Sequence, residues 1–185
     1  MTKTRGEILL IVLACVLMIN TLCSRKIYPE HSFINLTMAD EKKLENFMNG
    51  GIEKDLVTYN ISPGEIIHSA KKYIGVPHCM GGASERCMDC SGLLMKVFSE
   101  HGIALPHNSQ EQARFGQIIS RMEELKKGDL VFFIRSYRTH RFITHSGIYT
   151  GNHGFIHTSS NKGVTITSLD NPWWNEKFLF GTRIF

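Results

Sequence analysis

Residues 88–94 read MDCSGLL, and they place a cysteine directly before an apolar run. Leu93, Leu94 and Val97 repeat at the three- and four-residue intervals of one helix face. This pattern predicts a helix over residues 90–100 with the cysteine in its first turn. Four roles are open to such a thiol: core packing, a disulfide, a metal ligand, or a nucleophile at a helix start.

Two further helices are expected on either side of this one. Residues 62–65 read SPGE, a capping serine followed by proline at the first helical position and glutamate at the third. The apolar spacing that follows continues to Gly75, which we expect to stop the helix. A third helix is expected after Pro106, with Ser109 and Gln112 as its capping pair.

From Gly128 onward the pattern changes to short strands. These segments are rich in β-branched and aromatic residues and are separated by glycine and asparagine. The expected strands cover residues 129–134, 146–151, 154–159, 163–169 and 178–185. Helices followed by consecutive strands predict an α+β domain, in which the helices pack on an antiparallel sheet of five to six strands.

The composition is that of an ordinary globular protein. The chain has 185 residues, 42% of them hydrophobic and 21% charged, which suits one domain with a substantial core. The net charge of +4 is mild and selects no class of partner. No run of basic residues is interleaved with aromatic ones, so nucleic-acid binding is not expected.

The N-terminus has the pattern of an export signal. Lys3 and Arg5 precede the apolar run Ile8–Ile19, which is shorter than the roughly 20 apolar residues that a spanning helix needs. An uncleaved membrane anchor is the alternative. Cys15 and Cys23 are both placed imperfectly for lipidation. We therefore expect export to the periplasm or cell envelope, with membrane attachment through a signal or a lipid.

Three segments are expected along the chain. Residues 1–24 are expected to form the signal or anchor segment, residues 25–60 a weakly structured tether, and residues 61–185 the main folded domain. Within the tether, a weak helical pattern places Leu44 and Phe47 on one side. This stretch either lies on the domain or is partly disordered.

The position of Cys90 favours a nucleophile. A helix start offers unpaired N–H groups and the positive end of the dipole, which lower a thiol pKa and hold an oxyanion. Such a thiol needs a histidine base with an orienting partner. His145 and His157 lie twelve residues apart, in or beside two expected strands. If these strands pair through the Asn152-His153 turn, the two histidines become cross-strand neighbours.

Two other uses of the cysteines remain open. Cys79, Cys87 and Cys90 include one C-x-x-C spacing, which suits zinc but is a weak signal without a second pair. Alternatively, Cys79 and Cys87 form a disulfide beside the nucleophile, which an oxidising compartment permits.

Five ordered motifs carry a resemblance to a known family. They read GVPHCMGGASERCMDCSGLLMKVF, LPHNSQEQ, GDLVFF, THSGIYTGN and FIHTSSNKGV. In this order they resemble the NlpC-type family of bacterial cell-wall peptidases, which are papain-like cysteine enzymes, over residues 64–185. The tail and overall size resemble the Spr-type murein DD-endopeptidases of that family, which are small exported lipoproteins.

The resemblance implies a catalytic triad and a papain-like fold. Cys90 would be the nucleophile, His145 the general base, and His157 the orienting residue. The cysteine-bearing helix would pack against the sheet that carries both histidines. The implied enzyme needs no cofactor and no metal. Further residues are implied near the oxyanion and substrate, namely His78, Asp89 and Ser91.

Two features depart from the usual family pattern. His78 stands where the family often has tyrosine, and its ring N–H would serve as a pH-dependent donor. The segment IRSYRTHRF, residues 134–142, is insertion-like. It adds arginines that either lie in a solvated loop or contact carboxylates of the substrate, namely Arg135, Arg138 and Arg141.

The expected function is hydrolysis of peptidoglycan stem peptides by a monomer. The leading bond is the D-alanyl–diaminopimelate crosslink, as in the Spr type. The alternative bond is γ-D-glutamyl–diaminopimelate within one stem. A wall-binding module without turnover is a third reading, although such a module has no need of an intact triad.

Overall fold

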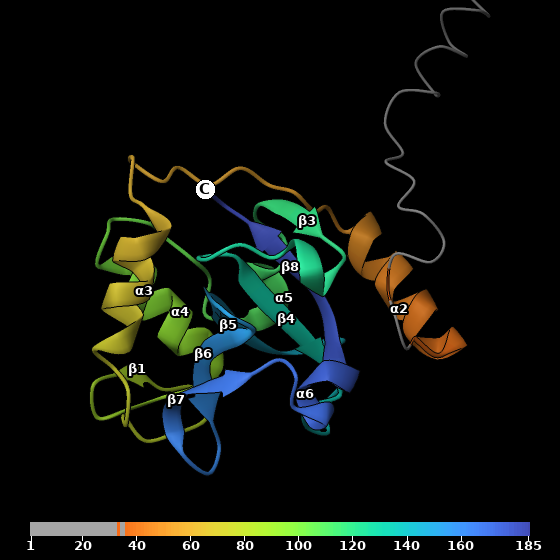
Figure 1. The fold of residues 1–185 in the computed structure, drawn as a ribbon. Helices are drawn as coiled ribbons and strands as arrows, with labels where there is room; N and C mark the ends of the chain where they lie inside the picture. The colour runs from red at the N-terminus through yellow and green to blue at the C-terminus, as the bar shows by residue number, and fades with distance from the viewer. Residues whose placement is uncertain (1–32, 34–35) are drawn as a thin grey trace, which may run out of the picture. The chain divides into compact units, whose positions relative to one another are not determined.

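The computed structural model describes Phe33 and residues 36–185, which pack as one unit (Figure 1). The expected export segment, with its basic residues, its apolar run and both of its cysteines, lies outside the described residues. Within the described part, no helix has the length and apolar character to cross a bilayer.

A six-stranded antiparallel sheet forms the centre of the domain, with its strands in the order β3-β8-β4-β5-β6-β7. The strands are β3 (Gln117–Ile119), β4 (Leu130–Ile134), β5 (Ile143–Gly151), β6 (Gly154–Ser159), β7 (Gly163–Ser168) and β8 (Phe178–Arg183). The last strand, β8, lies between β3 and β4. The predicted α+β class with an antiparallel sheet is confirmed.

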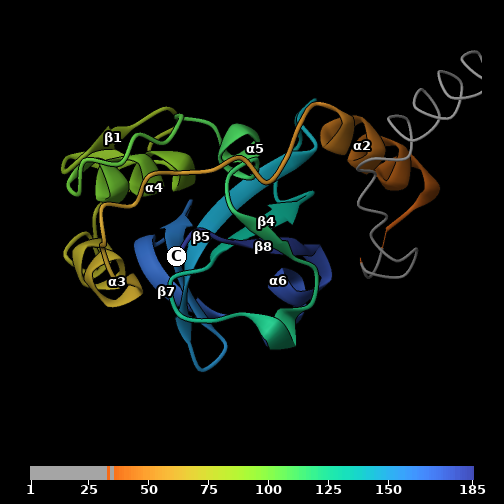
Figure 2. The same cartoon turned by 90° about the horizontal axis from the view of Figure 1, so that it is seen from above.

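Helices cover both faces of this sheet. They are α3 (Pro63–Lys71), α4 (Cys90–Ser99), α5 (Ser109–Gln112), α6 (Pro172–Lys177) and a 3-10 turn at Met122–Glu124. Figure 2 shows α4 and α5 on one side of the central strands and α6 on the other. A small hairpin, β1 (Ala83–Ser84) and β2 (Cys87–Met88), precedes α4.

The helix starts follow local capping rules, with one correction. Ser62 and Glu65 form the expected reciprocal capping box at the start of α3. The expected capping pair of α5 is wrong, because Asn108 is the N-cap and accepts hydrogen bonds from the backbone N–H groups of Gln110 and Glu111. The side chains of the expected pair make other contacts, Ser109 with the Cys90 sulfur and Gln112 with Ser146.

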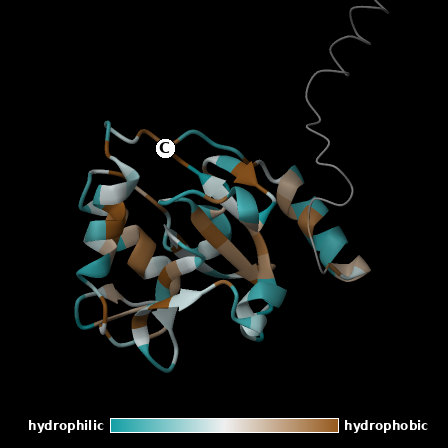
Figure 3. Cartoon of the chain, viewed as in Figure 1, coloured by the Kyte–Doolittle hydropathy of each residue, from teal (hydrophilic) through white to brown (hydrophobic). Residues whose placement is uncertain are grey.

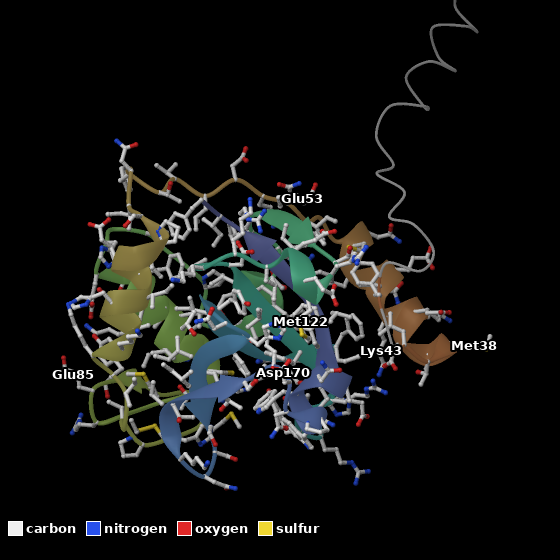
Figure 4. The ribbon with its side chains drawn as sticks, in the orientation of Figure 1. Met38, Lys43, Glu53, Glu85, Met122 and Asp170 are labelled. Atoms are coloured by element: carbon white, nitrogen blue, oxygen red, sulfur yellow. A yellow bond between two sulfur atoms is a disulfide. The ribbon has the colours of Figure 1, made fainter. Side chains whose placement is uncertain are left out.

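The core lies on both sides of β4. All five residues of this strand are buried, and Figure 3 shows hydrophobic colour concentrated on β4 and β8. One face packs Val131 and Phe133 against Tyr149 and Phe155. Met122 lies against this cluster from the 3-10 turn (Figure 4). Burial of each large side chain contributes roughly 1.5–3 kcal/mol, which fixes the strands that carry the histidines.

The segment before α3 contains helix α2 (Met38–Asn49), which packs on the domain. Leu44 and Phe47 are buried, as the helical pattern predicts for a segment lying on the domain, and the Phe47 ring lies 6.1 Å from that of Phe180 in β8. The Arg114 guanidinium lies 4.6 Å from the centre of the Phe47 ring and also donates to the Phe47 carbonyl. Met38, at the outer end of α2, is exposed (Figure 4).

Candidate active site

Helix α4 begins at Cys90, and Asp89 is its N-cap. One carboxylate oxygen of Asp89 accepts from the backbone N–H of Gly92 at 2.7 Å and from the Ser91 hydroxyl at 2.9 Å. The other oxygen accepts from the backbone N–H of Gly81 at 2.8 Å. The predicted position of the cysteine at a helix start is therefore confirmed, and the cap ties that start to the preceding loop.

The loop of residues 79–87 packs directly on the first turn of α4. A Cβ atom at Gly92 would overlap the carbonyl oxygen of Gly82, so only glycine permits this approach. A disulfide between Cys79 and Cys87 closes the loop, with a Cα–Cα distance of 5.5 Å. Because this bond occupies both sulfurs, the structure has the disulfide alternative and not the C-x-x-C zinc site. Cys90 is a free thiol.

The Cys90 sulfur lies at one end of a polar network from α5 and β5. Its Sγ is 3.5 Å from the hydroxyl of Ser109, which is 3.1 Å from the hydroxyl of Ser146. Ser146 donates to the side-chain oxygen of Gln112, and the Gln112 amide donates to the carbonyl of Ser91. The thiol is thus held by buried hydroxyl groups behind the helix start.

The environment of Cys90 favours the neutral thiol in the free protein. Burial raises the pKa of Cys90, and the Asp89 carboxylate adds to this, while the hydroxyls of Ser109 and Ser146 oppose it. This differs from the lowered pKa expected at a helix start, because desolvation of the thiolate outweighs the stabilising contacts. A thiolate therefore has to be generated by proton transfer.

The two histidines meet on adjacent strands, as predicted. β5 and β6 are joined at Asn152 and His153, both with positive φ, as in a tight hairpin turn. Nε2 of His145 lies 2.9 Å from Nδ1 of His157. Nε2 of His157 in turn lies 2.9 Å from the hydroxyl of Thr167 in β7. The histidine pair is therefore extended by a third polar group.

The surroundings of both imidazoles favour the neutral form. Burial, with a smaller contribution from His78, lowers the pKa of His145 to about 3, and Asp89 opposes this shift. Burial also lowers the pKa of His157 to about 2, with a contribution from His145. A neutral His145 has an unprotonated ring nitrogen, which is the state that a general base requires.

Trp174 of α6 covers the histidine pair. Its ring centre lies 4.8 Å from that of His145 and 4.8 Å from that of His157. Phe155 stacks on His157 from the sheet, with ring centres 4.5 Å apart. These aromatic rings keep water from the pair and fix both imidazole planes.

Cys90 and His145 open on to one cleft of about 350 Å3. His78 lines the same cleft from the loop before the disulfide, and Tyr137 and Arg141 line it from the loop before β5. His157 lies behind His145 and is buried. Helix α4 and strands β5 and β6 thus bring a free thiol and two imidazoles to one site.

A family model described as the NlpC/P60 family matches residues 75–183, which include all of these site residues. The chain belongs to the NlpC/P60 family.

Curated relatives agree with this assignment. A probable endopeptidase NlpC homolog of Haemophilus influenzae is 41% identical over 114 residues, covering 61% of this chain and 58% of the relative. The murein DD-endopeptidase MepS/murein LD-carboxypeptidase of Escherichia coli is 39% identical over 111 residues, covering 60% of this chain and 56% of the relative. The aligned segment thus spans little more than half the length of either relative.

Solved NlpC/P60 structures share the fold. A family protein from Bacillus cereus superposes with a TM-score of 0.61 at 30% identity, covering 67% of this chain and 40% of that chain. The NlpC/P60 domain of the peptidoglycan hydrolase SagA gives a TM-score of 0.58 at 26% identity, covering 66% of this chain and 99% of that domain.

The remaining residues expected at the site play different parts in this NlpC/P60 domain. His78, Asp89 and Ser91 all line the cleft. The polar side-chain atoms of Asp89 and Ser91, however, are used at the helix start, and Asp89 also lies 3.1 Å from Nε2 of His107. Of the three, only His78 has a side chain that forms no hydrogen bond within the described residues.

Sequence reasoning did not assign a site role to Ser109, Ser146, Thr167 or Trp174. Single hydroxyl residues in helices or strands carry no local signal, because their partners lie 10 to 37 residues away in sequence. Trp174 lies in the pair Trp173-Trp174 after a proline, which an apolar tail pattern does not distinguish from core packing. Only the three-dimensional arrangement brings these side chains to the site.

Proposed function

We propose that this domain is a cysteine peptidase that hydrolyses an amide bond in peptidoglycan stem peptides. The observation that carries the proposal is the free thiol of Cys90 in the cleft that His145 also lines, with His145, His157 and Thr167 linked in a row leading inward from that cleft. Membership of the NlpC/P60 family supports it, as do the names of the curated relatives. A binding module would have no need of a buried, oriented base beside a free thiol.

The proton path follows from the hydrogen bonds. Nε2 of His145 is engaged with His157, so Nδ1 of His145 is the nitrogen left to take a proton from the Cys90 thiol. For that, Nε2 of His145 must carry the ring hydrogen and donate to Nδ1 of His157. His157 then carries its hydrogen on Nε2 and donates to Thr167. One tautomer of each ring satisfies every contact.

The reaction proceeds by acyl transfer. As Cys90 attacks the substrate carbonyl, its proton moves to His145 and a carbon–sulfur bond forms. The imidazolium then protonates the leaving amine as the amide bond breaks, which leaves a thioester on Cys90. Water, deprotonated by His145, attacks the thioester and releases the acid and the free thiol. His157 orients His145 throughout and stabilises its charged form without a buried carboxylate.

The oxyanion site lies at the start of α4. The first N–H groups of a helix have no intrahelical acceptor, and Asp89 caps that of Gly92. The backbone N–H of Cys90 therefore remains for the substrate oxygen. A ring N–H of His78, across the cleft, supplies the second donor.

The leading bond is the D-alanyl–diaminopimelate crosslink, supported by the relative named murein DD-endopeptidase. The second candidate is the γ-D-glutamyl–diaminopimelate bond of one stem. It is supported by the gamma-DL-glutamyl hydrolase of Bacillus subtilis, which is 38% identical over 122 residues but aligns over only 29% of its own length. Such substrates lie in the cell envelope, so we propose export, with the N-terminal segment providing the signal or the membrane attachment. We also propose that the domain acts as a monomer.

The test is digestion of purified sacculi with the purified protein, followed by mass analysis of the released fragments. Loss of crosslinked dimers with gain of monomers identifies the leading bond, whereas shortened stems identify the second. Cys90→Ala is the matched control and should release neither. Binding to sacculi without release of fragments by the wild-type protein would instead identify a binding module.

A further inference from the structure

The loop between β4 and β5 lines one wall of the cleft and bears a positive charge there. Ser136, Tyr137 and Arg141 all line the cleft that holds Cys90. Arg138 lies in the same loop but does not line the cleft. Of these two arginines, Arg141 therefore lines the cleft and Arg138 does not.

Partly buried hydrogen bonds hold this wall in place. The side-chain oxygen of Gln110 in α5 accepts from the backbone N–H groups of Phe142 and Ile143, at 3.0 and 3.4 Å. At the other end of the loop, the hydroxyl of Thr144 accepts from the backbone N–H of Ser136 at 2.9 Å. Both ends are thus anchored to the elements that position the thiol and His145.

The charge of Arg141 is not neutralised within the described residues. Its guanidinium forms no ion pair or hydrogen bond there, and the side chain is exposed. Asp89 is the only carboxylate that lines the cleft, and the helix cap, Gly81 and His107 occupy its oxygens. Arg135, in contrast, lies 3.7 Å from Asp40 of α2.

Tyr137 provides a hydrogen-bond donor beside this charge. Burial raises the pKa of Tyr137, and the nearby Cys90 and Asp89 raise it further, while Arg141 opposes them. The phenol is therefore protonated at neutral pH. A guanidinium with an adjacent hydroxyl donor is suited to bind a carboxylate, and the long-range attraction is strongest in a cleft partly shielded from water.

We propose that Arg141 and Tyr137 form a subsite for a free carboxylate that flanks the amide bond to be cut. The inference rests on the proposed function and specifies its substrate. Stem peptides carry such a group on either side of the candidate bonds. The α-carboxylate of D-glutamate lies on the acyl side of the γ-glutamyl bond, and the carboxylate of the D-centre of diaminopimelate lies on the amine side of the crosslink.

The test uses defined stem peptides in matched pairs, each with one of these carboxylates free or converted to the carboxamide. The wild-type protein should have a higher kcat/KM for the free-carboxylate member of the pair that it cleaves. Arg141→Gln should lower kcat/KM roughly ten- to a hundredfold for that member and leave the carboxamide nearly unchanged, as for loss of a charged hydrogen bond. The pair that responds identifies which carboxylate is bound.

Arg138→Gln is the matched control, because it removes the same charge from the same loop outside the cleft. Three results would overturn the subsite. Arg141→Gln could lower kcat/KM equally for both members of a pair, it could leave kcat/KM unchanged for both, or Arg138→Gln could cause the same loss of kcat/KM. If the wild-type protein cleaves neither substrate, the peptidase proposal fails, and calorimetric binding by Cys90→Ala decides the subsite separately. The subsite is supported if Cys90→Ala binds the free-carboxylate peptide more tightly than the carboxamide and if adding Arg141→Gln to that variant abolishes the difference. Equal binding of both peptides overturns the subsite.

Discussion

His145 and His157 share a 2.9 Å contact between Nε2 and Nδ1, which fixes the orientation of the His145 imidazole without any carboxylate. Thr167 completes the arrangement from the next strand, at 2.9 Å from Nε2 of His157. Because each ring has a partner of its own, the hydrogen positions of both imidazoles are coupled. The predictions below follow from this coupling and from the burial around it.

Replacement of Thr167 should impair the chemical step. In Thr167→Val, His157 loses the acceptor that keeps its hydrogen on Nε2, so the other tautomer competes and turns Nδ1 from acceptor to donor. We expect kcat to fall roughly fivefold with KM unchanged, because the loss of one hydrogen bond costs about 1 kcal/mol. Thr167→Ser should restore the rate. Thr165→Val, on the same strand, is the control, and an equal loss there would show that the effect is structural.

The reactivity of Cys90 should rise with pH in the free protein. Because burial raises the pKa of this thiol above its ordinary value of 9.0, alkylation by iodoacetamide should be slow at pH 7 and accelerate into the alkaline range. Mass analysis of the peptide that contains Cys90 gives the rate. A fast plateau below pH 7 that disappears in His145→Ala would show a resting ion pair and contradict the neutral thiol.

The buried histidines should make folding stability depend on pH. Their folded pKa values lie below the ordinary histidine value of 6.5, so the unfolded chain binds more protons below that pH and the folded state loses stability as pH falls. The loss approaches about 1.4 kcal/mol per pH unit for each histidine. Urea unfolding between pH 7 and 5 measures this slope, before carboxyl groups contribute. His157→Asn should have a shallower slope, and an unchanged slope would exclude His157 as a source.

Loss of the Trp174 ring should let water reach the histidine pair. In Trp174→Ala, the pKa of His145 should rise toward 6.5, and activity below neutral pH should fall because a larger fraction of the base is protonated. Histidine NMR titration follows the shift, and Trp174→Phe should keep most of the shielding. Trp173→Ala is the control, because Trp173 contacts Trp174 but neither imidazole. Unaltered histidine titration in Trp174→Ala would refute the shielding role.

The disulfide should stabilise the loop beside the nucleophile. Its cysteines are separated by 8 residues, and closing so short a loop contributes about 2–3 kcal/mol in the chain-entropy model. The double variant Cys79→Ser/Cys87→Ser should therefore unfold at lower urea concentration and lose activity, since the loop positions His78. Reduction of the wild-type protein should give the same change. A reductant effect that persists in the double variant would point to another cause.

Much of this site was predictable because its signals are local. The helix start at Cys90 is marked by the residues around it, and the histidines fall in strands with clear β patterns. A tight turn between these strands makes them neighbours, so the sequence alone predicts that His145 and His157 lie close together. The same holds for α3, whose serine, proline and glutamate form a complete capping signature.

The parts that were not predicted depend on distant contacts. β3 has only three residues and pairs with the last strand, so its sequence alone carries little pattern. The pKa of Cys90 is raised, whereas the helix-start position predicts a lowered value. The local sequence does not show that α5 and β5 bury this thiol. Asn108, and not Ser109, is the N-cap of α5, and the Ser109 hydroxyl contacts Cys90 instead.

The place of β8 in the sheet has a consequence for the order of folding. This strand follows the other five strands of the sheet in sequence, yet it pairs with both β3 and β4. Until β8 joins the sheet, β4 lacks a partner on one side and β3 has none. The five preceding strands therefore cannot complete the sheet by themselves, and removal of Phe178–Arg183 would take out an interior strand.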